Sequence, residues 1–382
     1  MCYTPSISRW RDIAIRKILE TLSTVEDWRQ EKKVRHKMSD IIAIVLFASL
    51  ANANEWMEIY YFAKEHEAHL HKYLELPNGI PSHDTIQRVF AMVSPEFLQQ
   101  IQTQWNEMLT KGEGEKLRRI LAIDGKAQRG TATGKQKANH IISAVDENGF
   151  CLGQNRVDEK SNEITAIPKL LETLNVKGHI ITTDAMGTQT EIVKQIRKKH
   201  ADYVLALKGN QTGMYDDISR YFQDTELLAA CAYTYTIEKA RGGVEKREYW
   251  QTPDIAWLGQ RKKWVGLQSI AMTRNTVTRN GTTTVEERYF ISSLPLDIDL
   301  VSKAIRKHWM VESYHWHLDV TFKEDTNRTV DKDAAYNLNI IRKITLHILK
   351  LLSMSKTTVS LKAKRFMICM NSEKYIDMVM QL

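Results

Sequence analysis

Two aspartates in this chain each end a short apolar run, where a carboxylate could bind a metal ion. Asp124 ends the segment RILAID, and Asp184 ends the segment HIITTD. Either residue alone could cap a turn, because Asp is a common turn former. If the two runs are neighbouring strands, however, the two carboxylates repel each other unless a cation lies between them. The pair therefore predicts a cation site with oxygen ligands.

A third carboxylate is expected from residues 305–325, which contain four acids: Glu312, Asp319, Glu324 and Asp325. At helical spacing, Glu312 shares a face with His308 and Asp319, and the apolar and aromatic residues beside it would hold it against a sheet. Glu324 and Asp325 are expected to be solvated instead. Three carboxylates without cysteine suit Mg²⁺ or Mn²⁺, and a pair of such ions can activate a hydroxyl and stabilise the leaving oxygen of a phosphodiester.

The hydrophobic pattern after residue 116 predicts the elements that position the two aspartates. The expected order is strand 119–124, strand 140–146, strand 150–157, helix 163–174, strand 179–184, helix 188–200 and strand 202–208. Three meandering strands followed by two crossover units give an α/β fold, an RNase H-like mixed sheet with helices on both faces. In that topology the first and fourth strands are neighbours, so their carboxyl ends bring Asp124 and Asp184 together.

The regions around this core have a different character. Residues 1–115 show helical periodicity and are expected to be all-α, with Ser39 capping a helix that begins at Asp40 and Ser82 capping another. Residues 232–298 are rich in Thr, Tyr, Val and Trp and contain two glycine turns, which indicates a β-rich insertion. The expected domains are therefore 1–115 (helical), 116–231 (first part of the core), 232–298 (insertion), 299–355 (helices that complete the core) and 356–382 (a basic helical tail).

The composition is that of a globular protein with a basic surplus. Of 382 residues, 43% are apolar and 26% are charged, and the formal net charge is +8. The four cysteines lie too far apart for a zinc pattern or a disulfide framework. The most apolar run, residues 41–51, is shorter than the roughly 17–25 residues of a membrane helix, and no secretory signal is visible. We expect a cytoplasmic protein with a polyanionic partner and no membrane partner.

Several polar residues are candidates for contact with DNA. Arg88 belongs to the scattered basic residues of the N-terminal helices, which are expected to bind DNA. Lys126 and Arg129 follow Asp124, and three polar residues follow the fifth strand. A solvated helix face or loop is an equally simple interpretation of such charges. The candidates are Arg88, Lys126, Arg129, Lys208, Asn210 and Gln211.

Five blocks along the chain resemble those of the H-repeat-associated, ISAs-type DDE transposases of bacterial insertion sequences. In order, they are AIDGKAQRG, VDEKSNEITAIPKLLETL, IITTDAMGTQ, ADYVLALKGNQ and HWMVESYHWHLDVTFKED. The loop GIPSHDTIQRVF, residues 79–90, resembles the family's N-terminal associated region, and the similarity extends over about residues 25–380. The resemblance implies Asp124, Asp184 and Glu312 as the catalytic, metal-binding triad, in an RNase H-like core interrupted by a β insertion before the glutamate.

The resemblance also implies an activity and its partners. The chain would be a DNA transposase that cleaves at the ends of an insertion sequence and transfers the freed strand to target DNA, using Mg²⁺ or Mn²⁺, with two ions per site. Its partners would be double-stranded DNA, as inverted-repeat ends and as target. Because one RNase H-like site supplies one triad, a homodimer on DNA is expected, in the bacterial cytoplasm and at the nucleoid when bound.

The chain departs from the family pattern at two places. The commoner first block has Thr-Leu where this chain has Ala127-Gln128. Related transposases place Arg and Lys four before and seven after the glutamate, where this chain has His308 and Asp319, so His308 becomes a candidate for contact with DNA. Two other functions stay open: a nuclease of this fold without strand transfer, and a transposase-derived protein that binds DNA without catalysis.

Overall fold

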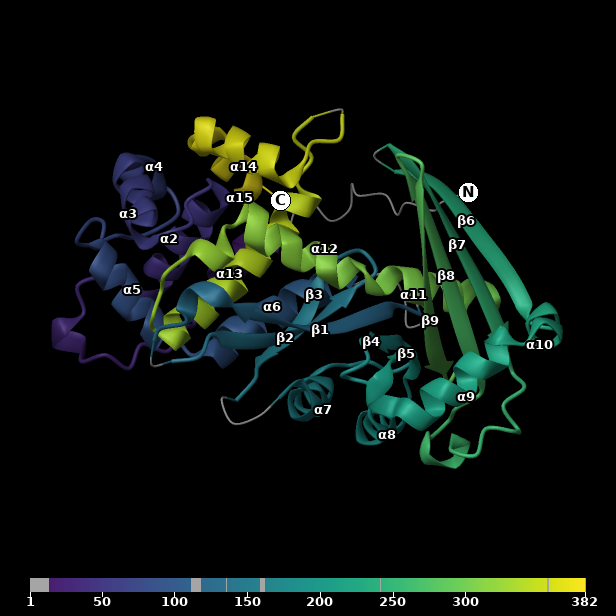
Figure 1. The fold of residues 1–382 in the computed structure, drawn as a ribbon. Coiled ribbons are helices and arrows are strands. Elements are labelled where there is room, and N and C mark those ends of the chain that lie inside the picture. Colours follow the sequence, from purple (N-terminus) through teal and green to yellow (C-terminus); the bar gives the residue numbers. More distant parts are fainter. Residues whose placement is uncertain are drawn as a thin grey trace. The chain divides into compact units, whose positions relative to one another are not determined.

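The computed structural model describes residues 14–110, 118–134, 136–158, 162–240, 242–355 and 357–381. These residues form two compact units, which are considered separately (Figure 1). The sheet unit comprises the described residues of 115–126 and 141–314, and the helical unit comprises those of 1–114, 127–140 and 315–382. Within the described ranges, no helix is both long enough and apolar enough to cross a membrane.

A nine-stranded mixed sheet forms the centre of the sheet unit. Its strands are β1 (Ile120–Gln128), β2 (Asn139–Asp146), β3 (Cys151–Arg156), β4 (Ile180–Thr183), β5 (Asp202–Leu207), β6 (Ala232–Ala240), β7 (Gly243–Thr252), β8 (Ser269–Arg279) and β9 (Thr282–Ser292). Their order across the sheet is β3-β2-β1-β4-β5-β9-β8-β7-β6. The first five strands have the predicted topology, so the RNase H-like fold class is confirmed. The last two residues of β1 and the first two of β2 belong to the helical unit.

Helices cover both faces of this sheet, as predicted (Figure 1). They are α7 (Glu163–Thr173), α8 (Thr190–Lys198), α9 (Thr212–Gln223), α10 (Thr225–Ala229) and α11 (Ile298–His308). Leu121 and Ile181 are buried with residues of α7, α8 and α9 on one face, whereas Ile120 and Ile180 are buried with residues of α11 on the other. The central strands are therefore apolar on both sides, which explains why their sequences are continuous apolar runs. The sequence did not predict α9 and α10.

The register of β1 and β4 determines where the two aspartates lie. The strands are parallel neighbours, as predicted, and Ile123 and Thr183 are their last paired residues. Asp124 and Asp184 are therefore the next residues on adjacent strands. The expectation that the first strand ends at Asp124 is wrong, because β1 runs on to Gln128 with β2 as its other neighbour.

The predicted insertion forms both expected hairpins and also continues the central sheet. β6 and β7 are joined at Gly242, and β8 and β9 at Asn280-Gly281; all three residues have positive φ, as tight hairpin turns require. β9 then pairs antiparallel with β5. The insertion is thus joined to the core by a ladder of backbone hydrogen bonds, which the sequence did not predict.

The helical unit is built around two buried helices, α2 and α13. Its helices are α1 (Ala14–Leu22), α2 (Met38–Leu50), α3 (Trp56–Glu65), α4 (Glu67–Leu70), α5 (His83–Met92), α6 (Pro95–Thr110), α13 (Lys332–Leu351), α14 (Leu361–Met370) and α15 (Ser372–Met380). Ser82 caps α5 as predicted, because its Oγ accepts a hydrogen bond from the Thr85 N–H. α2 starts after Lys37 rather than after Ser39, and it is buried on all sides because α1, α3, α5, α13 and α14 all pack on it.

The helical periodicity expected after residue 300 is interrupted in the structure. α11 ends at His308; α12 (Met310–Trp316), a π-helical turn (His317–Thr321) and a 3₁₀ turn (Glu324–Thr326) precede α13. Lys323 has a φ of 51°, which a continuous right-handed helix excludes. Contacts group residues 315–355 with the N-terminal helices, whereas the sequence assigned residues 299–355 to the core. The division of function among the predicted domains stays a prediction.

Candidate active site

A cleft of about 670 Å³ opens in the sheet unit beside Asp124 of β1 and the carboxyl ends of β4 and β5. Asp124, Asp184 and Glu312, the three acids predicted from the sequence, all line this cleft. Other walls come from the insertion strands and from α11. Polar and aromatic residues on these walls include Lys208, Arg247, Arg274, Arg288, Arg306, His308 and Trp309.

The carboxylate of Asp184 is fixed by the turn that it starts. Its Oδ1 accepts hydrogen bonds from the backbone N–H groups of Met186 (3.0 Å) and Gly187 (3.2 Å). A Cβ on Gly187 would lie 2.7 Å from Thr183, so the turn packs too closely for a larger residue. Burial raises the pKa of Asp184, and the charge of Asp124 raises it further against the lowering effect of the two hydrogen bonds. The charge of Asp124 therefore opposes the ionisation of Asp184, and a bound cation would relieve this.

Glu312 reaches the cleft from α12. Its neighbours Val311 and Tyr314 are buried, as predicted, while Glu312 itself is exposed. The expectation that Glu324 is solvated is wrong: it is only 2% exposed, and its Oε1 lies 3.6 Å from Nη1 of Arg342 within the helical unit. A buried carboxylate needs such a partner. The sequence around Glu324 does not reveal it, because the partner lies on a different helix, α13.

The acids of the cleft suit a divalent metal ion by chemical type. All three offer carboxylate oxygens, which Mg²⁺ and Mn²⁺ prefer, and the raised pKa of Asp184 indicates a charge that a cation would stabilise. In the part of the chain that is described, no group of three His, Cys, Asp or Glu side chains is placed so that it could hold an ion. Asp124, Asp184 and Glu312 thus line one cleft and suit such an ion by type, but they are not placed as a set of three ligands.

Sequence reasoning missed four cations that line the cleft: Arg247, Arg274, Arg288 and Arg306. The first three each pair with a glutamate of the same or a neighbouring strand at 2.8 or 2.9 Å. Arg288 also lies over the ring of Trp309, 4.6 Å from its centroid. A signal was available for two of them, because Arg247 lies two residues after Glu245 and Arg288 two residues after Glu286, and this spacing places each pair on one face of its strand.

The three candidates after β5 have different positions. Lys208 is exposed and lines the cleft. Asn210 Nδ2 donates to the backbone oxygen of Ala185 (2.6 Å), and Gln211 Nε2 donates to that of Thr188 (3.0 Å). These two side chains support the loop after the second aspartate, a role that the sequence did not predict. Contact of all three residues with DNA stays a prediction.

The remaining candidates lie in separate places. His308 lines the cleft, its Nδ1 lies 3.0 Å from Thr182 Oγ1, and burial lowers its pKa. Lys126 is half-buried on β1 in the sheet unit, whereas Arg88 and Arg129 are exposed residues of the helical unit. The structure therefore brings His308 and Lys208 to the cleft with the three acids.

Comparison with known proteins shows the family of the chain. The family described as "Transposase DDE domain" matches residues 115–348, and the one described as "DDE_Tnp_1-associated" matches residues 19–106. The chain is 38% identical over 354 residues to "Putative transposase YncI" of Escherichia coli O157:H7, with 88% of each chain covered. It is 36% identical over 348 residues to "H repeat-associated putative transposase YhhI" of Escherichia coli strain K12, with 88% of this chain and 90% of that protein covered. The chain therefore belongs to the DDE transposase family.

Proposed function

We propose that this chain is the transposase of an insertion sequence and that Asp124, Asp184 and Glu312 form its catalytic site. It cleaves DNA at the ends of the element and joins the freed 3′ hydroxyl to target DNA. The observation that supports this most directly is the register of β1 and β4, which sets the two aspartates side by side at a cleft that Glu312 also lines. Membership of the DDE transposase family supports the same class of reaction.

The residues of the cleft have different proposed roles in this reaction. The three acids bind two Mg²⁺ or Mn²⁺ ions, which when bound activate the attacking hydroxyl and stabilise the leaving oxygen. Lys208, His308 and the cleft arginines hold the phosphates of the bound strand. Because glutamates neutralise three of these arginines, the cleft binds DNA through exchange of ion-pair partners as well as through net charge.

Double-stranded DNA is the proposed partner in both steps, first as inverted-repeat ends and then as target. Arg88, Lys126, Arg129, Asn210 and Gln211 are proposed as further DNA contacts. Joining two ends requires two sets of acids in one complex, and each chain provides one set, so we propose a homodimer on DNA. The reaction would take place in the bacterial cytoplasm, at the nucleoid.

The variants Asp124→Asn, Asp184→Asn and Glu312→Gln test the catalytic site. Asp254→Asn is the matched control, because Asp254 is an exposed carboxylate of the same unit that does not line the cleft. Each of the three variants should lower cleavage of a labelled inverted-repeat end by at least about 100-fold in Mg²⁺ or Mn²⁺, since ligands of one metal site act as a unit. Binding of the same DNA, measured by fluorescence anisotropy, should stay close to that of the unmodified chain.

Three results would overturn parts of this proposal. Near-normal cleavage by Glu312→Gln would reject the third ligand. Cleavage by the unmodified chain without joining to target DNA would identify a nuclease of the same fold. Specific binding of the ends without any cleavage would identify a DNA-binding protein derived from a transposase.

A further inference from the structure

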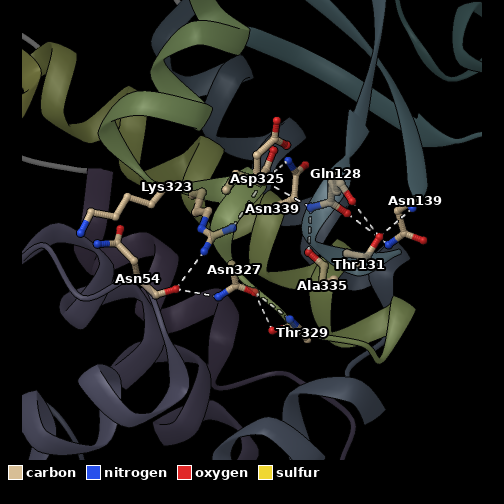
Figure 2. Close-up of polar contacts among 12 residues, drawn as sticks. Asn54, Gln128, Thr131, Asn139, Lys323, Asp325, Asn327, Thr329, Ala335 and Asn339 are labelled. Carbon is tan, nitrogen blue, oxygen red and sulfur yellow. Dashed lines mark hydrogen bonds and ion pairs between the residues drawn. The ribbon is translucent and has the colours of Figure 1, made fainter. Parts of the chain in front are cut away.

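Two segments that leave the proposed catalytic residues meet inside the helical unit. The first follows Asp124: β1 runs on to Gln128 and continues as the 3₁₀ turn Arg129–Thr131. The second follows Glu312, where the chain passes through α12 and the π-helical turn to the 3₁₀ turn at 324–326. The two 3₁₀ turns pack against each other (Figure 2). We call this contact the junction.

The backbones of the two segments approach very closely at the junction. The backbone N–H of Arg129 donates to Asp325 Oδ1 at 3.3 Å. A Cβ on Gly130 would lie 2.0 Å from the carbonyl oxygen of Asn327, far inside van der Waals contact. Position 130 therefore accepts glycine alone unless one of the two segments moves.

A buried polar network centred on Glu324 adjoins the backbone contact. Its members Gln128, Asn139 and Asn339 are labelled in Figure 2. The Oε1 of Glu324 accepts hydrogen bonds from Gln128 Nε2 (3.3 Å) and from Asn339 Nδ2 (2.8 Å), and it lies 3.6 Å from the Arg342 guanidinium. Gln128 is itself buried and accepts a hydrogen bond from Asn139 Nδ2 at 3.1 Å. Glu324, which lies in the second segment, is thus hydrogen-bonded to Gln128 of the first segment and to Asn339 of α13.

The second segment is also anchored to the N-terminal helices. Asn327 Nδ2 and Arg342 Nη2 both donate to the backbone oxygen of Asn54, at 2.8 and 2.9 Å. Trp56 Nε1 donates to Thr329 Oγ1 at 2.8 Å. These contacts fix the junction in the interior of the helical unit, where a displaced polar group would lose its partner.

We propose that the junction positions Asp124 and Glu312, the two acids that precede it in its two segments. It holds the segment that follows each acid and does not touch either carboxylate. Gly130, Gln128 and Glu324 are its positioning residues. The inference rests on the proposed function, because it takes both acids as catalytic. An extended strand links Gln128 to Asp124. Glu312 is linked to Glu324 by α12 and the π-helical turn, which are followed by a break at Lys323, so a shift at the junction reaches Asp124 along one strand and Glu312 through this interrupted helical segment.

Gly130→Ala tests the junction, and Gly134→Ala is its matched control. A Cβ at position 134 would meet no atom within 4 Å, although the residue lies in the same loop. Hydrogen–deuterium exchange of the full chain should become about tenfold faster in both β1 and α12 for Gly130→Ala only, because the junction no longer restrains them. Asp325→Ala, which removes one partly exposed contact, should give the same pattern more weakly and serves as the test if Gly130→Ala does not fold.

End cleavage provides a second readout. For Gly130→Ala, kcat should fall by up to about 100-fold while KM for end DNA is unchanged, since small displacements of catalytic groups are costly. Exchange and kcat equal to those of Gly134→Ala would overturn the proposal, as would faster exchange confined to the junction itself. Because exchange needs no activity, it still decides the role of the junction if the unmodified chain fails to cleave DNA.

Discussion

The guanidinium carbon of Arg288 lies 4.6 Å from the ring centroid of Trp309, and both residues line the cleft that contains the two aspartates. Arg288 belongs to β9, the last strand of the insertion, and Trp309 directly follows α11. Stacking on an aromatic face orients the guanidinium plane, and Glu286 accepts a hydrogen bond from its Nε at 2.9 Å. The insertion thereby supplies a cation that is far in sequence from both aspartates but lines the same cleft.

Arg288→Ala is expected to weaken binding of end DNA and to lower the salt dependence of binding. Loss of one phosphate contact should reduce the slope of log K against log salt by about 0.9, because one fewer counterion is released. Arg288→Lys should keep most of the slope but bind more weakly, since the stacking is lost. Anisotropy titrations at several salt concentrations measure both effects. Arg261→Ala, an exposed cation outside the cleft, is the control, and equal slopes for the two alanine variants would contradict the prediction.

Asp184 should make both stability and metal affinity depend on pH. Its pKa is raised in the folded chain, first by burial, so the native state holds the proton more tightly than the unfolded state. The resulting stabilisation of the metal-free protein is present below the ordinary pKa of Asp and is lost as pH rises through the raised value. Affinity for Mn²⁺ should increase over the same range, because the ion displaces the proton.

Asp184→Asn is expected to remove the contribution of this residue to both pH dependences. Urea unfolding and calorimetric titration with Mn²⁺, each repeated over a series of pH values, measure them. A Mn²⁺ affinity of the unmodified chain that stays constant across this range would show that Asp184 does not bind the ion.

Asn210 and Lys208 allow support of the Asp184 loop to be separated from contact with DNA. Asn210→Ala removes the hydrogen bond to Ala185, which contributes about 1 kcal/mol, so cleavage at saturating DNA should slow about fivefold with unchanged DNA affinity. Lys208→Ala removes an exposed charge from the cleft and should weaken DNA binding instead. Single-turnover cleavage over a range of DNA concentrations distinguishes the two. If Asn210→Ala lowers affinity alone, Asn210 is a DNA contact.

Arg365 is expected to be essential for the stability of the helical unit. It is fully buried on α14, and its guanidinium donates to backbone oxygens of Ser49 and Thr321 and to Asn54 Oδ1. Arg365→Met should lower the free energy of unfolding by about 3 kcal/mol or more, because each buried acceptor left without a donor costs about 1–3 kcal/mol. Urea unfolding followed by circular dichroism measures this. Lys362→Met, exposed on the same helix, should leave the midpoint unchanged, and equal midpoints would refute the prediction.

The parts of the fold that the sequence predicted depend on local patterns. The short apolar runs before Asp124 and Asp184 and the order of strands and helices were sufficient for the topology of the first five strands and for the adjacent positions of the two aspartates. The parts that it missed depend on partners far along the chain. The burial of Glu324 requires Arg342, and the place of β9 beside β5 follows from strand pairing that no local pattern specifies.

The contact between Arg365 and Asn54 also constrains how the protein is made. The two residues are 311 positions apart. At about 5–20 residues per second, the N-terminal helices wait roughly 15–60 s on the ribosome before Arg365 is synthesised. A gene copy truncated shortly before this codon would encode every residue of the proposed active site and still leave the helical unit unfinished. Such a deletion would prevent transposition although it removes none of the proposed active-site residues.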